Sequence, residues 1–494
     1  MKNIRRYLCV ALVAVVCLTA LFALCACAAD PMKTAIKNGD NYTIVASYDP
    51  TNHALSVTQV TEYTNRSDNA FASVKLHIYA NAYREGATVV PNTYRATAYP
   101  NGTSYGEISF DSVSVDGAAC AYRIEGDNCD ILSVPLAKEL FPGDKVCIEM
   151  TYNVTLANIK HRLGYTDNAV VCGNFFPVVC NTVDNDFDQT SYCAVGDPFV
   201  SACANFDVTL RAPQTYTVAA SGTLDYVTSE SDYDTWHFQG KAMRDFAMVL
   251  SDKYKKLTKK AGNTQVNYFY YADEDAEGSL ATACAALEYF NKNIGAYPYE
   301  QYTVCETDFC YGGMEYPALV LVASGSKAYT EAIVHETAHQ WFYGVVGNDQ
   351  IRNAWMDEGL AEFLTCLYLD HANVQPLATS VKMLTKTYIT YVDVLNRYYN
   401  HADTTFRSLT EYKNDSEYVV MTYTKGSLLF ATLYETMGEG KFLRALSDYY
   451  KQNAYTIATP QNMTDSFVRC GNKELSTIFD KFANGQEIVG KVTD

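Results

Sequence analysis

The stretch HETAH at residues 335–339, followed by WMDEG at residues 355–359, decides the fold of this chain. Two histidines four positions apart lie on one face of a helix, so His335 and His339 can reach the same metal ion. Glu358 follows far enough along the chain for one helix to end and another to begin. A His/His/Glu set that leaves a fourth position for water is typical of catalytic zinc sites. The spacing predicts one zinc ion per chain, although a bare motif of this kind also occurs by chance.

Two further carboxylates can serve this site without binding the metal. Glu336 lies next to His335 on the helix and can lean over the open side of the ion, where it would act as general base. Glu362 shares a helix face with the glutamate ligand and would orient a histidine through its other ring nitrogen; the alternative is an ordinary solvated charge. The apolar pattern predicts that the motif helix continues through 341–345 and that a second helix covers 355–363.

Two more motifs flank the metal motif in the chain. YGGMEYP occupies residues 311–317 upstream, and YTKG occupies residues 423–426 downstream. Together with HETAH and WMDEG, and in this order, they resemble the gluzincin metallopeptidases of the aminopeptidase N type. The first motif is similar to the family's exopeptidase signature Gly-x-Met-Glu-Asn, and the second to the segment with its catalytic tyrosine. Looser similarity extends over 174–177 and 245–250.

The resemblance implies a role for each motif. Glu315 would bind the free α-amino group of a peptide substrate. Gly312, Gly313 and Met314 would lie beside it on an edge strand, along which an extended peptide adds by main-chain hydrogen bonds. Tyr423 would donate a hydrogen bond to the developing oxyanion. Peptides are therefore the expected substrates, and removal of one N-terminal residue at a time is the expected reaction.

Tyr316 departs from this pattern because the family motif ends in Asn. The departure raises the alternative that Tyr316 marks altered substrate binding, as in an endopeptidase or a different zinc hydrolase. A third hypothesis is a non-catalytic peptide-binding lipoprotein on a retained scaffold. Retention of Glu336 and of the three metal ligands argues against that third hypothesis.

The first residues predict export. A basic start is followed by an uncharged run over 7–26, which ends in LCAC at 24–27. This looks like a bacterial lipobox, so residues 1–27 are interpreted as a lipoprotein signal peptide with Cys27 as the acylated residue. An ordinary secretory signal or an uncleaved anchor is the alternative. We expect an extracytoplasmic protein attached to the bacterial cell membrane through its N-terminal lipid, or secreted if the lipobox is not used.

Composition limits the function and the fold. A net charge of -18 argues against nucleic acid as a partner, and 48% hydrophobic residues support sizeable cores. We expect an α+β protein: a polar tether over 28–40, an antiparallel β domain over 41–253 and a mainly helical peptidase domain over 254–494. The resemblance implies that the first domain is saddle-like and the second thermolysin-like, without the large C-terminal helical domain of many relatives. The sequence leaves the oligomeric state open, and equally whether the cysteines after Cys27 form disulfides or stay free.

Overall fold

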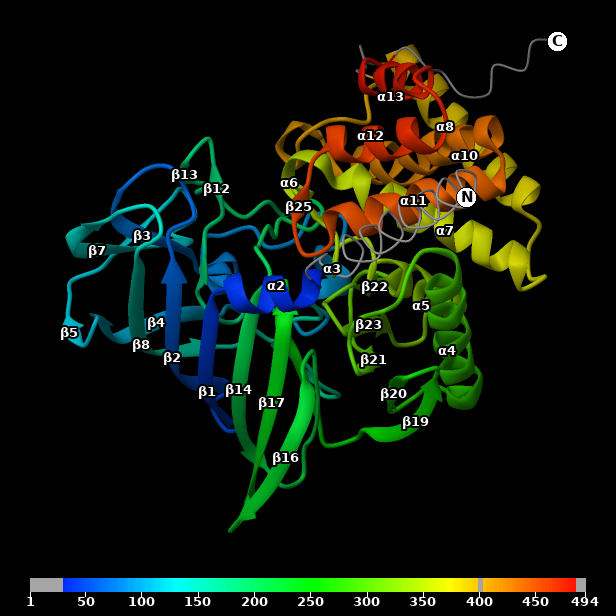
Figure 1. Ribbon diagram of the computed structural model, residues 1–494. Coiled ribbons are helices and arrows are strands. Elements are labelled where there is room, and N and C mark those ends of the chain that lie inside the picture. The colour runs from blue at the N-terminus through cyan, green and yellow to red at the C-terminus, as the bar shows by residue number, and fades with distance from the viewer. Residues whose placement is uncertain (1–29, 399–402, 486–494) are drawn as a thin grey trace, which may run out of the picture.

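The computed structural model describes residues 30–398 and 403–485, and strands dominate its first half while helices dominate its second (Figure 1). This confirms the predicted α+β class and the order of its two parts. The predicted signal peptide and the lipidation site Cys27 lie outside the described residues. Within 30–398 and 403–485, no helix combines the length and the apolar character that a membrane crossing requires.

The N-terminal half is built on one large, mostly antiparallel sheet. Its first strand buries every second residue, including Tyr42, Ile44 and Tyr48, because successive side chains of a strand point to opposite faces. From edge to edge the sheet contains β16 (Thr223–Glu230), β17 (Tyr233–Met243), β14 (Ala204–Pro213), β1 (Asn41–Asp49), β2 (Ala54–Thr64), β8 (Lys145–Thr155), β4 (Glu107–Val115) and β5 (Ala118–Ala119).

Two four-stranded sheets and a small hairpin complete this half. One sheet contains β15 (Thr217–Ala220), β18 (Met248–Ser251), β10 (Val170–Cys172) and β9 (Leu163–Tyr165). The other contains β11 (Val178–Val179), β3 (Phe71–His77), β7 (Ile131–Leu140) and β6 (Arg123–Glu125). The hairpin pairs β12 (Thr182–Val183) with β13 (Asp186–Phe187), and two short helical segments are η1 (Tyr79–Tyr83) and α3 (Arg95–Ala98).

The stretch interpreted as a tether contains a helix, α2 (Pro31–Asn38). Asp30 caps it by accepting from two backbone N–H groups, and Pro31 stands at its first position, where its missing N–H costs nothing. Asn205 on β14 donates to the Ile36 carbonyl at 2.9 Å, so the helix is tied to the large sheet. The prediction overlooked this capping signal.

The catalytic half begins with a five-stranded sheet that α4 (Ala276–Asn293) covers (Figure 1). Its order is β19 (Lys255–Ala261), β20 (Thr264–Tyr270), β21 (Gln301–Thr307), β23 (Leu319–Ala323) and β22 (Gly313–Met314). The short strand β22 pairs antiparallel with β23 and forms one edge of the sheet.

Helices form the rest of the chain, together with a two-stranded pairing of β24 (Gly347–Asn348) and β25 (Ile457–Ala458). They are α5 (Tyr329–Ala338), α6 (Gln350–Asn353), η2 (Ala354–Met356), α7 (Glu358–His371), α8 (Leu377–Tyr398), η3 (Leu409–Glu411), α9 (Asp415–Tyr418), the π-helical η4 (Val419–Lys425), α10 (Gly426–Met437), α11 (Glu439–Asn453), α12 (Pro460–Cys470) and α13 (Leu475–Ala483).

The helix that carries the metal motif ends earlier than the apolar pattern predicts. α5 stops at Ala338, and the chain turns back instead of continuing through 341–345. Tyr343 has a φ of 142°, which no helix accommodates. Trp341 and Phe342 are buried on the turned segment, and the Trp341 indole donates to the Gly295 carbonyl at 2.8 Å. The apolar residues were recognised as core correctly, but their periodicity does not belong to one helix.

The cysteines after Cys27 all fall in the described part of the chain, and all are free thiols. Seven are buried, where a thiol acts as a small apolar side chain. The interpretation as free thiols, left open by the sequence, is the one that the structure supports.

Candidate active site

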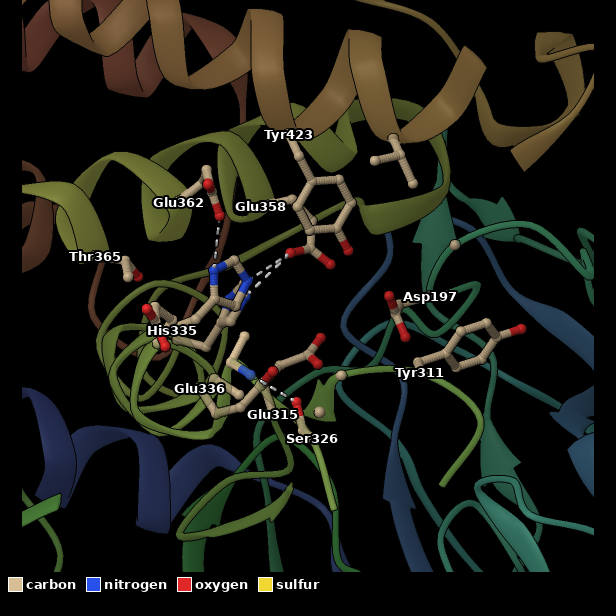
Figure 2. A pocket seen from close by; sticks show the side chains of 18 of the residues that line it. Asp197, Tyr311, Glu315, Ser326, His335, Glu336, Glu358, Glu362, Thr365 and Tyr423 are labelled. Carbon is tan, nitrogen blue, oxygen red and sulfur yellow. Dashed lines mark hydrogen bonds and ion pairs between the residues drawn. The ribbon is translucent and has the colours of Figure 1, made fainter. Parts of the chain in front are cut away.

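The two motif histidines and Glu358 converge on one point (Figure 2). Glu358 Oε2 lies 3.2 Å from His335 Nε2 and 3.2 Å from His339 Nε2, and the two Nε2 atoms are 3.1 Å apart. Donors bonded to one tetrahedral zinc ion at about 2.0–2.1 Å lie about 3.3–3.4 Å from one another. Two imidazoles and one carboxylate at this spacing therefore fit a zinc ion, and leave one side of it free.

The second ring nitrogen of each histidine faces an acceptor. His339 Nδ1 lies 3.2 Å from the Phe342 carbonyl oxygen, and His335 Nδ1 lies 3.5 Å from Glu362 Oε2. These contacts favour the proton on Nδ1 and leave the Nε2 lone pair for a metal. The Glu362 side chain is 32% exposed, so it is neither fully solvated nor buried. The early end of α5 therefore helps to orient His339, because the turn that follows brings the Phe342 carbonyl within reach of its Nδ1.

Local structure at the start of α7 positions Glu358. Asp357 caps this helix by accepting from the Glu358 N–H at 3.0 Å, so its carboxylate is a helix cap. A Cβ on Gly359 would lie 2.8 Å from the Cα of Gly426, so these two glycines let the junction of η4 and α10 approach α7. π-Helical turns occur often at functional sites, and η4 places the ring of Tyr423 over His335, with centroids 6.0 Å apart.

Glu336 packs against the edge strand β22. A Cβ on Gly313 would collide with its carboxylate, so the glycine lets Glu336 keep its present position. Burial raises the pKa of Glu336 to about 7. A carboxylate with such a pKa can accept and return a proton near neutral pH. Gly312, by contrast, has open space on its Cβ side.

Glu315 lies beside the metal triad in a group of buried carboxylates (Figure 2). Carboxylate oxygens of Asp197, Glu315 and Glu358 lie within 4.8 Å of one another. Burial, followed by the charge of Asp197, raises the pKa of Glu315 well above its usual value. Arg162 pairs with Asp197, and Gln350 donates to Glu315 Oε1 at 2.9 Å. Neighbouring carboxylates in low dielectric attract a cation.

Comparison with known proteins gives the chain's relatives. Residues 279–482 match the Peptidase family M1 domain, and the metal triad, the Met-Glu motif and the tyrosine all lie within that range. This match, the aminopeptidase relatives and the similar solved structures support an aminopeptidase N-type gluzincin family.

Curated relatives of this chain are named as aminopeptidases. Leucine aminopeptidase 2 of Yarrowia lipolytica is 24% identical over 421 residues, which is 79% of this chain and 59% of that protein. Aminopeptidase N of Lactococcus lactis is 22% identical over 60% of this chain and 37% of its own length. The chain thus spans at most about three fifths of these relatives.

Solved structures share the fold over almost their whole length. The M1 zinc metallopeptidase of Deinococcus radiodurans aligns with a TM-score of 0.66 at 16% identity, over 91% of this chain and 95% of that one. A mutant of the same enzyme bound to a Tyr-Ser-Ala substrate aligns with a TM-score of 0.64 at 15% identity, over the same shares. These neighbours support a two-domain M1 architecture.

Two residues of the upstream motif point away from the cleft. Met314 is buried, its sulfur accepts from Arg162 Nε at 3.2 Å, and it is not among the residues that line the cleft. Tyr316 is also buried; its hydroxyl donates to Asn174 Oδ1 at 3.2 Å and lies where a Cβ on Gly173 would be. The Tyr316 side chain thus joins the N-terminal half and does not line the cleft, which argues against direct contact with substrate.

The cleft has a volume of about 540 Å³, within the range of ligand sites in proteins. Asp197 and Tyr311 lie on one side of the metal triad, and Glu362 and Thr365 on the other (Figure 2). Asp197, Arg162 and Gln350 were missed from sequence, since each lies outside the recognised motifs and only the fold brings them to the site.

Proposed function

We propose that this chain is a zinc-dependent aminopeptidase that removes single residues from the N-termini of peptides outside the cytoplasm. The observation that carries the proposal is the position of Glu315 and Asp197 beside the metal triad. An α-ammonium group held by these carboxylates puts the first peptide carbonyl of the substrate next to the metal site. The distance from amine to metal then selects the first peptide bond.

His335, His339 and Glu358 would hold the zinc ion. When bound, zinc acts as a Lewis acid that polarises a carbonyl and makes water a nucleophile near neutral pH. Glu336 accepts the proton from the attacking water and returns it to the leaving amine. Tyr423 donates its phenol hydrogen to the carbonyl oxygen as negative charge develops there. Glu362 keeps the His335 ring in the required orientation.

The backbone of the edge strand supports substrate binding. Gly312 and Gly313 border the cleft without side chains, and β22 has one paired and one unpaired edge. An extended peptide that adds to the free edge forms main-chain hydrogen bonds, which tolerate varied side chains.

Export and lipid attachment are part of the proposal. They rest on the uncharged run over 7–26 and on the lipobox-like LCAC at 24–27. Replacing Cys27 by Ala tests this: labelling of the wild-type protein by palmitate, with loss of the label and release from the membrane in the variant, is expected. Unlabelled wild-type protein would contradict lipid attachment.

The catalytic proposal is tested with aminoacyl anilides and the same compounds N-acetylated. The purified protein should release the anilide only from free-amine substrates, and Glu336→Gln should abolish the release while zinc stays bound. Hydrolysis of the acetylated compounds, or of internally quenched peptides with blocked amino ends, would instead support an endopeptidase.

A further inference from the structure

Gln350 at the start of α6 connects two carboxylates of the site. Its Nε2 donates to Glu315 Oε1 at 2.9 Å and to Asp357 Oδ2 at 2.8 Å. The side chain is buried, and its Oε1 has no hydrogen-bond partner within the described part of the chain. The opposite orientation of the amide would press its oxygen against two carboxylate oxygens, so the two acceptors determine which end is nitrogen.

A buried carbonyl oxygen without a partner is unfavourable, and such atoms are rare in folded proteins. The two hydrogen bonds to carboxylates therefore stabilise this position of the amide by more than the unpaired oxygen destabilises it. The neighbouring Asp197 is held differently, because its partner Arg162 carries a positive charge that offsets the carboxylate. Gln350 is neutral, so it orients Glu315 and adds no positive charge beside it.

We propose that Gln350 is a positioning residue for amine recognition: it holds the Glu315 carboxylate in place through a neutral hydrogen bond, so that the second oxygen and the negative charge stay available to the α-ammonium of the substrate. This inference rests on the proposed aminopeptidase function and adds the residue that makes its amine-binding carboxylate rigid.

Loss of this amide affects the two carboxylates unequally. Asp357 keeps the Asn348 side chain, which donates to Oδ1 at 3.0 Å, and the Glu358 N–H. For Glu315, Gln350 is the sole hydrogen-bond donor that the described residues provide. The start of α7 and the metal triad should therefore persist without Gln350, while Glu315 becomes free to change rotamer.

The test compares two ligands on the zinc-loaded full chain: leucine hydroxamate and its analogue without the amino group. Calorimetric Kd values are measured for wild type and for Gln350→Met, which keeps the volume but removes the donor. For Gln350→Met we expect about a tenfold weaker Kd for the amine-bearing ligand, the usual scale for a hydrogen bond to a charged group, and less than threefold for the analogue.

Gln461→Met is the matched control, because it removes an amide-to-carboxylate hydrogen bond of 2.7 Å on the surface of α12. Zinc content and thermal unfolding are measured for every variant. Equal amine discrimination in folded, zinc-loaded wild type and Gln350→Met would overturn this inference and leave the aminopeptidase proposal standing. Joint weakening of both ligands, or loss of zinc, would show a purely structural role and also overturn it. A wild type that binds both ligands equally would overturn the aminopeptidase proposal, and the inference with it.

Discussion

Replacing Gly313 by Ala should disable the general base without touching a metal ligand. An added Cβ at Gly313 overlaps the Glu336 carboxylate, so that carboxylate has to move within the cleft that it lines. The backbone of Gly313 is not left-handed, so alanine fits the strand itself. Glu336 must therefore turn away from the position in which it reaches the attacking water. General bases contribute about 10² to 10⁴ in rate, so kcat should fall by about 10² or more.

The assay is steady-state hydrolysis of an aminoacyl anilide, with zinc content and thermal unfolding measured in parallel. The neighbouring Gly312→Ala variant is the internal comparison, because its Cβ would point into open space. Its effect on kcat should be at least about tenfold smaller, since the base keeps its place. Wild-type kcat in a folded, zinc-loaded Gly313→Ala protein would refute the argument, and so would equal losses in the two variants.

Three further predictions concern other parts of the site and its support. Asp197→Asn should raise KM for free-amine substrates about tenfold and change kcat less, because one carboxylate of the ammonium site loses its charge. Steady-state kinetics on two anilides measure both parameters, and a fall in kcat with little change in KM would instead place the residue in the chemical step. Tyr316→Phe should lower the free energy of unfolding by about 1–3 kcal/mol, because it leaves the Asn174 oxygen unpaired, and kcat/KM should stay within about twofold of the wild-type value. Urea unfolding measures the first quantity and steady-state kinetics the second. A changed dependence on the free amine of the substrate would contradict the assigned position of Tyr316. Burial raises the pKa of Asp245 to about 7, whereas its value in the unfolded state lies near 3.8. The unfolded state therefore loses this proton first, so the stability of the wild type should fall between pH 4 and pH 7 relative to Asp245→Asn, by up to about 1.4 kcal/mol per pH unit, and then level off. Parallel urea titrations in which the difference in stability stays flat over this window would refute the prediction.

The metal triad was predictable because its chemistry is local. His335 and His339 are related by the period of one helix, and Glu358 begins α7 after a connection that holds only the short α6 and η2, so the motif spacing indicated that all three can meet. The short strands were predictable for the same kind of reason, since alternation of apolar residues is a property of each strand by itself. Errors arose where local patterns mislead: an apolar run was assigned to α5 although Tyr343 turns the chain, and a polar stretch hid the capped helix α2.

Sequence by itself determined the residue types of the reaction centre, the α+β order of the chain and the family resemblance. Only the tertiary structure decided which other side chains meet there. Asp197 comes from the N-terminal half and Gln350 from a short helix, and both reach Glu315 through folding that no local period records. Tertiary structure also turned the Tyr316 side chain away from the cleft. Side-chain direction depends on what packs across the domain boundary, and contacts between residues far apart in the chain leave no spacing that a sequence pattern can show.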